Sequence, residues 1–277
     1  MQKIKAVFVD FDGTLGNDKR EVSETDRNSL KQLGNAGVLR AVATGRSLWA
    51  SLLVLEPDFP IDYIVFSSGS GIYDFNKKEI IHKVDLPQNK AVEIATELLN
   101  CNLDFKLIKP IPNNEYFTYY ASSNPSADIL FRKEKYAKFE LPFVPIHEFG
   151  ETGQVLAIFP PNGNTFEKLE QKFDNVSVIR ATSPLDGKSI WAEFFEHGIS
   201  KAYGANFICQ LHNILPHETM AVGNDFNDID LLEFTPNRFV TENAAPELKR
   251  NYTNVKSNNE SGVTDAFCKA KVLHVEC

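Results

Sequence analysis

The chain has 277 residues, enough for one large domain or two smaller ones. Hydrophobic residues make up 43% of it and charged residues 24%, the balance of a soluble globular protein. The formal net charge of −8 at pH 7 disfavours a nucleic-acid-binding surface, and no apolar stretch is long enough to span a membrane.

The four cysteines show neither the spacing of a zinc site nor that of a redox pair. They stand at Cys101, Cys209, Cys268 and Cys277, and such scattered thiols favour a reducing cytoplasm. The first predicted strand begins at Ile4, so no signal peptide is expected before it. We therefore expect a cytoplasmic protein without a membrane or nucleic-acid partner.

The stretch over residues 4–15 predicts a strand that ends in acidic residues. Residues 4–9 are a short apolar run, typical of a buried strand in a parallel sheet. Asp10 and Asp12 follow it directly, before a turn at Gly13. Two carboxylates at the end of a buried strand are costly without a partner, and a bound divalent cation would remove that cost. The alternative without a function is a plain Asp/Gly turn.

The remaining elements up to residue 83 alternate between helix and strand. The pattern predicts a helix from Ser23 to about Gly37, a strand at 38–43, a helix over 48–55, a strand at 61–66 and a hairpin over 71–82. This order is typical of the first half of a doubly wound sheet.

Residues 84–184 show a different pattern of predicted elements. Predicted helices at 88–100, 125–136 and 165–173 are interspersed with strands at 104–109, 116–122, 154–159 and 176–181. No acidic cluster follows any of these strands. We interpret the segment as a separate α+β domain inserted into the first, the alternative being one continuous sheet.

The pattern of the first segment resumes after residue 184. It predicts a strand at 190–195, a helix capped by Ser200, a strand at 219–222, a short helix from 229, a strand at 239–240 and helices from 246 and 261. The predicted fold class is therefore α/β. A doubly wound, mostly parallel sheet core comprises 1–83 and 185–277, with 84–184 inserted.

Polar residues gather where the strands of this core end. They are Asp10 with Asp12, Thr44, Lys201, and the run 224–228. In an open α/β sheet these ends face one crevice, where ligands bind. The acids would suit Mg²⁺, the lysine and the hydroxyl would suit an anion, and a carboxylate beside both could attack it. Such a site is suited to phosphoryl transfer.

These segments resemble the four ordered motifs of haloacid-dehalogenase-like (HAD-like) hydrolases. The matching residues are Asp10-Phe-Asp12-Gly-Thr14, Thr44-Gly-Arg46, Ser200-Lys201 and Gly223-Asn-Asp-Phe-Asn227-Asp228. The resemblance is closest to the Cof-type, sugar-phosphatase-like branch, whose type-B α+β cap lies between the second and third motifs. Glu193 and the runs 243–249 and 261–263 also fit that branch.

The resemblance implies a role for each matched residue. Asp10 would be the nucleophile that forms an aspartyl-phosphate, and Asp12 would protonate the leaving oxygen and then activate water. Thr44 and Lys201 would bind the phosphoryl group, and Asn227 would either bind it as well or order the loop. For Arg46, a contact with substrate and a purely structural role both remain open.

Mg²⁺ is the implied cofactor, and the fourth motif departs from the family pattern at one of its ligands. Asn224 stands where the family usually has an aspartate, and the acid is displaced to Asp225. We expect ligands from Asp10, Asp12, Asp225 and Asp228, with Asn224 as the alternative to Asp225. The loop after the third strand, Ser68-Gly69-Ser70, also departs from the usual Asn-Gly-Ala.

The resemblance implies a Mg²⁺-dependent phosphomonoester hydrolase that acts on a small phosphorylated metabolite. Sugar phosphates are the commonest substrates of the family, and the inserted domain would be the cap that sets specificity. Two alternatives remain at this stage: a phosphomutase of the same fold, and a non-catalytic regulatory protein that binds phosphate.

Overall fold

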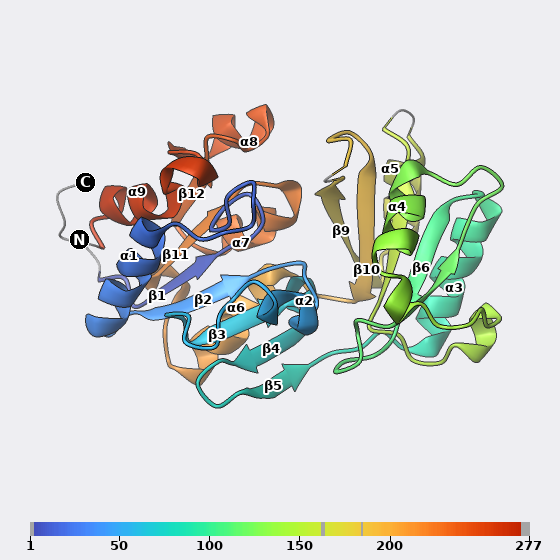
Figure 1. Cartoon of the computed structure of the whole chain (residues 1–277), viewed down its shortest axis with the longest axis horizontal. Helices are drawn as coiled ribbons and strands as arrows, with labels where there is room; N and C mark the ends of the chain where they lie inside the picture. The colour runs from blue at the N-terminus through green and yellow to red at the C-terminus, as the bar shows by residue number, and fades with distance from the viewer. Residues whose placement is uncertain (1–2, 162–163, 184, 273–277) are drawn as a thin grey trace. The chain divides into compact units, whose positions relative to one another are not determined.

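The computed structural model describes residues 3–161, 164–183 and 185–272, and it has the predicted α/β class (Figure 1). The chain forms two compact units. One comprises Met1–His82 with Ser200–Cys277, and the other comprises Lys83–Ile199. Among the described residues, every helix is too short or too polar to cross a membrane.

The first unit is built on an eight-stranded sheet in the order β13-β12-β11-β1-β2-β3-β4-β5. Neighbouring strands pair in parallel from β13 to β3, and β4 is antiparallel to β3. The strands are β1 (Ala6–Val9), β2 (Leu39–Ala43), β3 (Tyr63–Phe66), β4 (Gly71–Asp74), β5 (Glu79–Lys83), β11 (Thr219–Gly223), β12 (Asn237–Thr241) and β13 (Thr253–Val255).

Helices bury the faces of this sheet. They are α1 (Glu24–Asn35), α2 (Leu48–Leu52), α6 (Lys201–Leu211), α7 (Ile229–Phe234), α8 (Pro246–Asn251) and α9 (Gly262–Lys269). Ser23 caps α1 as predicted, with its hydroxyl accepting the Asp26 amide. Phe8 of β1 packs with Ile208 of α6 and Leu231 of α7 in one apolar cluster. Because every residue of β1 is buried, the strand is rigidly packed, and Asp10, which follows it directly, starts from a fixed position.

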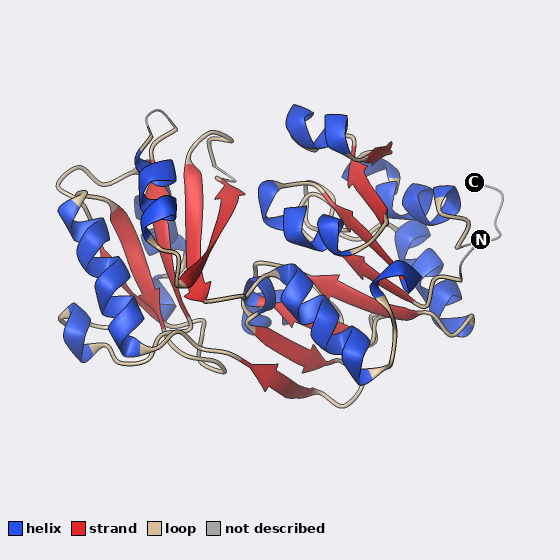
Figure 2. Ribbon diagram, turned by 180° about the vertical axis from the view of Figure 1, so that it is seen from behind, coloured by secondary structure: helices blue, strands red, loops and turns tan. Residues whose placement is uncertain are grey.

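The second unit is built on an antiparallel sheet in the order β7-β6-β8-β10-β9 (Figure 2). Its strands are β6 (Asp104–Ile108), β7 (Phe117–Tyr120), β8 (Gln154–Phe159), β9 (Val176–Thr182) and β10 (Ile190–Glu196). Its helices are α3 (Gln88–Asn100), α4 (Ala127–Lys135) and α5 (Thr165–Lys172).

The two faces of this second sheet differ. Phe105, Val155 and Phe194 point into an apolar core shared with α3 and α5. Arg132 of α4 stacks on Trp191, whose strand neighbour Ala192 belongs to that core, so α4 covers the opposite face. Figures 1 and 2, which view the molecule from opposite sides, show α4 and the α3–α5 pair on different faces.

The predicted end of the inserted segment at residue 184 is wrong. β10 pairs with β8 and β9 in the second sheet, and the chain returns to the first unit only at Ser200. The apolar run at 190–195 predicts a buried strand but carries no information on which sheet it joins. At the other end, the division falls within one residue of the predicted 83/84.

Two further features differ from the sequence-based expectations. β13 was not predicted, because Thr253–Val255 is short and has little apolar character. Cys101 and Cys209 are free as expected, whereas Cys268 is disulfide-bonded.

Candidate active site

The predicted site residues of the first unit do gather at one edge of its sheet. β1 lies between β2 and β11, and all three run in parallel. Asp10, Thr44 and Asn224 directly follow these three strands, while Lys201 is the first residue of α6. The topology therefore places the first, second and fourth motifs side by side, as expected for the carboxyl edge of a doubly wound sheet.

Lys201 is the centre of the site. Its ammonium group donates to Asp10 Oδ1 at 2.7 Å, to Asp228 Oδ1 at 2.5 Å and to Asn227 Oδ1 at 3.5 Å. The Lys201 side chain is completely buried. Ser200 caps α6 by accepting the Tyr203 amide at 3.3 Å, which fixes the backbone that carries the lysine. The predicted phosphate-binding lysine is thus held between two carboxylates, Asp10 directly after β1 and Asp228 in the turn after β11.

This buried cluster holds one positive and two negative charges. Burial, and after it the nearby Asp228 carboxylate, raise the pKa of Asp10 to about 7, although Lys201 opposes both effects. Burial alone would lower the pKa of Lys201, but Asp10 and Asp228 outweigh it and raise the pKa. The lysine therefore stays charged, and the surplus negative charge rests on the carboxylates.

Asp228 uses both of its oxygens within the protein. Oδ1 accepts a hydrogen bond from the Lys201 ammonium group. Oδ2 accepts hydrogen bonds from the backbone N–H groups of Asn224 and Asp225, at 2.8 and 3.1 Å. A Cβ at Gly223 would lie 2.6 Å from the Asp228 Cβ, so this loop requires glycine there. Through these contacts Asp228 shapes the loop and holds Lys201. Its predicted contact with the metal, direct or through water, stays a prediction.

Asp12 pairs with Arg46 through two parallel hydrogen bonds. Arg46 Nε donates to Oδ2 at 2.6 Å, and a terminal nitrogen donates to Oδ1 at 2.5 Å. The guanidinium also lies over the Phe11 ring, 4.9 Å from its centroid. This forked geometry fixes the carboxylate in direction as well as position. Arg46 is thus a partner of the predicted acid, a role that the motif did not distinguish from a purely structural one.

The Asn224 side chain lies against the oxygens that the family resemblance assigns to Mg²⁺. One end of its amide is 3.0 Å from the Asp12 carbonyl oxygen, 3.2 Å from Asp10 Oδ2 and 3.0 Å from Thr14 Oγ1. The hydrogen-bond network favours the orientation in which the amide nitrogen donates to these acceptors, and to bind a metal the amide would turn so that its oxygen faces them.

With its oxygen inward, Asn224 completes a set that suits a small hard cation. Ligand oxygens around octahedral Mg²⁺ are roughly 3 Å apart, and the inward end of the Asn224 amide lies 3.2 Å from Asp10 Oδ2 and 3.0 Å from the Asp12 carbonyl oxygen. No group of three or more His, Cys, Asp or Glu side chains suited to a metal occurs in the described part of the chain. A site here would accordingly combine one carboxylate with carbonyl-type oxygens. The fourth-motif side chain beside Asp10 and the Asp12 carbonyl is that of Asn224, which the sequence offered as the alternative ligand to Asp225.

Thr44 is buried at the end of β2, and its hydroxyl accepts the Arg46 amide at 3.2 Å. It does not cap the following helix, because Ser47 caps α2 by accepting the Ala50 backbone amide. Thr44 thus presents its hydroxyl from the end of a buried strand.

The loop after β3 helps to place Lys201, which the sequence did not reveal. Ser67 and Ser68 have positive φ of 47° and 51°, a conformation that non-glycine residues rarely adopt. A Cβ at Gly69 would lie 2.0 Å from the Ser200 carbonyl oxygen, so glycine permits the close approach to α6. The run of serines and glycines was the available signal.

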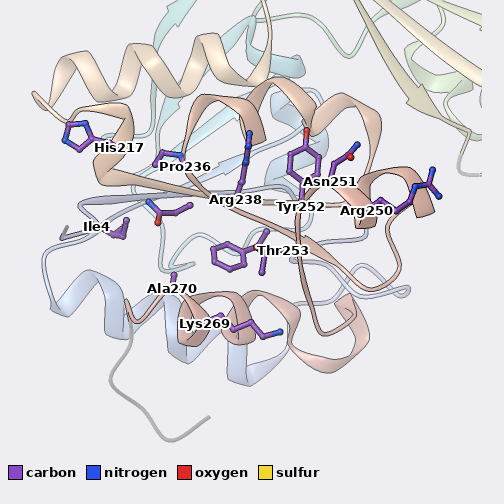
Figure 3. Close-up of a pocket in the computed structure, with 12 residues that line it drawn as sticks. Ile4, His217, Pro236, Arg238, Arg250, Asn251, Tyr252, Thr253, Lys269 and Ala270 are labelled. Atoms are coloured by element: carbon purple, nitrogen blue, oxygen red, sulfur yellow. The ribbon is translucent and has the colours of Figure 1, made fainter. Parts of the chain in front are cut away.

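A pocket of about 490 Å³ lies elsewhere in the first unit (Figure 3). It is lined by residues that include Ile4, Asn237 and Lys269. Ile4 precedes β1 and Asn237 begins β12, whereas Asp10 and Asn224 follow strand ends. The pocket is therefore at the opposite edge of the sheet, away from the gathered motifs.

The sequence matches the haloacid dehalogenase-like hydrolase family over residues 7–267, and the chain belongs to this family. It is 26% identical over 280 residues to 5-amino-6-(5-phospho-D-ribitylamino)uracil phosphatase YwtE of Bacillus subtilis, covering 94% of this chain and 96% of that protein. It is 24% identical to phosphatase YwpJ of the same organism, covering 94% and 97%. The predicted family and the prediction of an enzyme, a phosphatase, are confirmed.

Solved structures show the same fold. BT1666 from Bacteroides thetaiotaomicron, a phosphatase of this superfamily, superposes with a TM-score of 0.79 at 22% identity, covering 98% of this chain and 96% of that one. The HAD subclass IIB sugar phosphatase BT4131 superposes with a TM-score of 0.79 at 19% identity, covering 97% and 100%. The predicted fold class, a doubly wound sheet with an inserted α+β domain, is confirmed.

Proposed function

We propose that the protein is a Mg²⁺-dependent phosphomonoester hydrolase that acts on a small phosphorylated metabolite in the cytoplasm, with sugar phosphates as the first candidates. The observation that carries the proposal is the position of the Asp10 carboxylate. Lys201 holds its Oδ1 at 2.7 Å, and its Oδ2 faces the Asn224 amide, which also lies 3.0 Å from the Asp12 carbonyl oxygen. A carboxylate held between a cation and a candidate metal position is placed to attack a phosphorus atom.

The proposed reaction has two steps. An Asp10 oxygen bonds to phosphorus while the ester oxygen leaves and takes a proton from Asp12, giving an aspartyl-phosphate and a free alcohol. Asp12 then takes a proton from water, which attacks the phosphorus and releases phosphate and the Asp10 carboxylate. Lys201, Thr44 and Asn227 would hold the phosphoryl oxygens. Arg46 would keep the Asp12 carboxylate in the orientation needed for proton transfer.

Asp10, the Asp12 carbonyl and Asn224 would hold Mg²⁺. A bound divalent cation would neutralise phosphoryl charge and offset the surplus negative charge of the Asp10–Asp228 cluster. Asn224 is preferred here to Asp225, the ligand expected from the sequence, because the Asn224 amide lies against Asp10 and the Asp12 carbonyl.

The second unit, Lys83–Ile199, would act as the cap that selects the substrate. The solved sugar phosphatase of subclass IIB, whose fold spans both units, supports this reading. In such enzymes a cap excludes water and provides the contacts that distinguish one ester from another.

A panel assay tests the proposal. Purified protein is incubated with phosphorylated sugars, nucleotides and cofactors, with Mg²⁺ or with excess chelator, and released phosphate is measured. We expect turnover with Mg²⁺, none with chelator, and none in Asp10→Asn. Asp58→Asn, a change at an exposed carboxylate of the same unit, is the matched control and should keep wild-type turnover. Turnover undiminished by chelator, or by Asp10→Asn, would contradict the mechanism.

A binding measurement distinguishes the two candidate metal ligands. Mg²⁺ affinity is measured by calorimetry without substrate in Asn224→Ala, Asp225→Asn and wild type. The geometry of the Asn224 amide predicts that Asn224→Ala weakens Mg²⁺ binding by roughly 10- to 100-fold and that Asp225→Asn changes it less. The reverse order would assign the ligand to Asp225.

A further inference from the structure

Four hydrogen-bond donors lie on the face of the second sheet that α4 covers. They are Lys106 of β6, Tyr119 of β7, Arg132 of α4 and Trp191 of β10, and we refer to them as the donor cluster. Lys106 lies directly opposite Tyr119 in the antiparallel pair of β6 and β7, so the two side chains point to the same face of the sheet. The Arg132 guanidinium lies 4.3 Å from the Trp191 ring centroid.

The donors of this cluster lack acceptors. Tyr119 Oη, Arg132 Nε and Trp191 Nε1 are buried without a hydrogen-bond partner. Lys106 is only 5% exposed, and its ammonium lies 4.8 Å from the Phe117 ring centroid. Within the described ranges, neither Lys106 nor Arg132 forms an ion pair or a hydrogen bond through its charged group.

Buried polar groups are normally paired, and an unpaired charge is the most costly exception. Ammonium, guanidinium and indole groups donate and do not accept, so their unmet requirement is for an acceptor. Burial lowers the pKa of Lys106 well below its usual value, and the charge of Arg132 adds to this. Two cations close enough to repel each other across a buried face are the arrangement that a bound anion would stabilise.

The neighbouring acids do not fill this requirement. The Glu193 carboxylate of β10 acts to raise the pKa of Lys106, but its Oε1 accepts a hydrogen bond from the Gln154 side chain at 3.3 Å. Asp128 of α4 acts on Arg132, but its Oδ1 accepts the Ser183 hydroxyl at 3.0 Å. Glu193 also acts on Arg132, Tyr136 acts on both Arg132 and Tyr119, and Glu140 acts on Tyr119. In the described part of the chain, Tyr136 and Glu140 form no hydrogen bond to either residue.

We propose that the donor cluster is a binding site for an oxyanion, either inorganic phosphate or the anionic group of a larger metabolite. The ammonium and the guanidinium would supply charge, and the Tyr119 hydroxyl and the Trp191 indole would supply two neutral donors. The aromatic rings around them would exclude water and strengthen each contact. This inference does not depend on the proposed function, because it rests on residues of the second unit alone.

Trp191 provides a local reporter. The chain has two tryptophans, so Trp49→Phe leaves Trp191 as the only one. The titrations use Asp10→Asn in the same background, so that turnover does not consume the ligand. Inorganic phosphate is one probe and a hexose bisphosphate is the other, and the emission of Trp191 is recorded.

We expect a saturable change in Trp191 emission with at least one probe. Lys106→Met should weaken that binding roughly tenfold or more, as the loss of one charge-assisted contact requires. Arg132→Met should do the same, so the result does not depend on one variant folding. Lys168→Met, an exposed lysine on α5 at the other face, is the matched control and should bind like the parent.

The two probes distinguish the two sources of the anion. A response to inorganic phosphate that Lys106→Met removes identifies a free-anion site. A response only to the bisphosphate, also removed by Lys106→Met, identifies a site for one acidic group of a larger molecule. No response to either probe, or a response unchanged in both Lys106→Met and Arg132→Met, would overturn the proposal.

Discussion

Two buried groups of charged residues in this protein differ in how their cations are matched. In the first unit, Lys201 bonds to Asp10, Asp228 and Asn227, and the surplus charge is negative. In the donor cluster of the second unit, neither Lys106 nor Arg132 forms a hydrogen bond or an ion pair with a described residue through its charged group. A matched cation mainly maintains the geometry of its partners, whereas an unmatched one indicates a ligand that the chain itself does not supply.

The comparison predicts opposite effects when the two lysines are replaced, and the larger effect is at Lys201. Lys201→Met leaves the Asp10 and Asp228 carboxylates buried without their cation. Removing one partner of a buried ion pair typically costs about 3–5 kcal/mol of unfolding free energy. We expect this loss in the urea unfolding of the first unit, followed through Trp49 in a Trp191→Phe background.

A double variant is the control for this prediction. Adding Asp228→Asn to Lys201→Met removes one of the two unmatched carboxylates and should recover part of the lost stability. If Lys201→Met alone unfolds at the wild-type urea concentration, the ion cluster does not hold the site together.

Lys106→Met should raise the free energy of unfolding, the opposite of the effect expected for Lys201→Met. Replacing a buried, unmatched ammonium by an apolar side chain of similar length should stabilise the second unit at pH 7 by about 1–4 kcal/mol. The pKa of Lys106 is lowered by folding, so the unfolded chain binds the proton more tightly. The cost of the lysine is therefore largest at low pH and falls as pH rises towards 10.5, the ordinary value for lysine.

Urea unfolding followed through Trp191 in the Trp49→Phe background measures this effect at pH 7 and at pH 10. The stabilisation by Lys106→Met should be smaller at pH 10. A variant less stable than wild type at pH 7 would mean that Lys106 has a favourable partner, and the contrast between the two lysines would not hold.

Arg46→Lys should have the smallest effect of the three changes. A lysine keeps the charge beside Asp12 but cannot make the two parallel bonds of 2.5 and 2.6 Å. We expect kcat to fall roughly tenfold through misalignment of the acid. With a good leaving group the fall should be smaller, because less protonation is needed.

Arg27→Lys is the matched control, since Arg27 bonds to Glu56 on the surface through one nitrogen. It should leave kcat unchanged with every ester. Equal losses in Arg46→Lys for good and poor leaving groups would contradict a role for Arg46 in directing the acid.

Local patterns predicted most of the fold. The apolar run at residues 4–9 gave β1, and Ser23 and Ser200 marked the starts of α1 and α6, because these signals are local. The unit to which β10 belongs could not be predicted, because it depends on pairing with β8 and β9 across the chain.

The candidate site was predicted to the level of residues but not of contacts. The four motifs identified Asp10, Asp12, Thr44 and Lys201, yet the fork between Arg46 and Asp12 and the engagement of both Asp228 oxygens depend on three-dimensional positions. The donor cluster was not predicted at all. Lys106 and Arg132 look like ordinary polar positions of a strand and a helix until the register places them on one covered face.

The central claim of this account is that Asp10 forms a bond to phosphorus. The most direct measurement is acid quenching of Asp12→Asn with an ester that has a good leaving group, followed by mass spectrometry of the peptide that contains Asp10. The account predicts the added mass of one phosphoryl group on Asp10, present with Mg²⁺ and absent with chelator or in Asp10→Asn. An unmodified Asp10 peptide while the alcohol is being released, or a phosphoryl group on another residue, would contradict it.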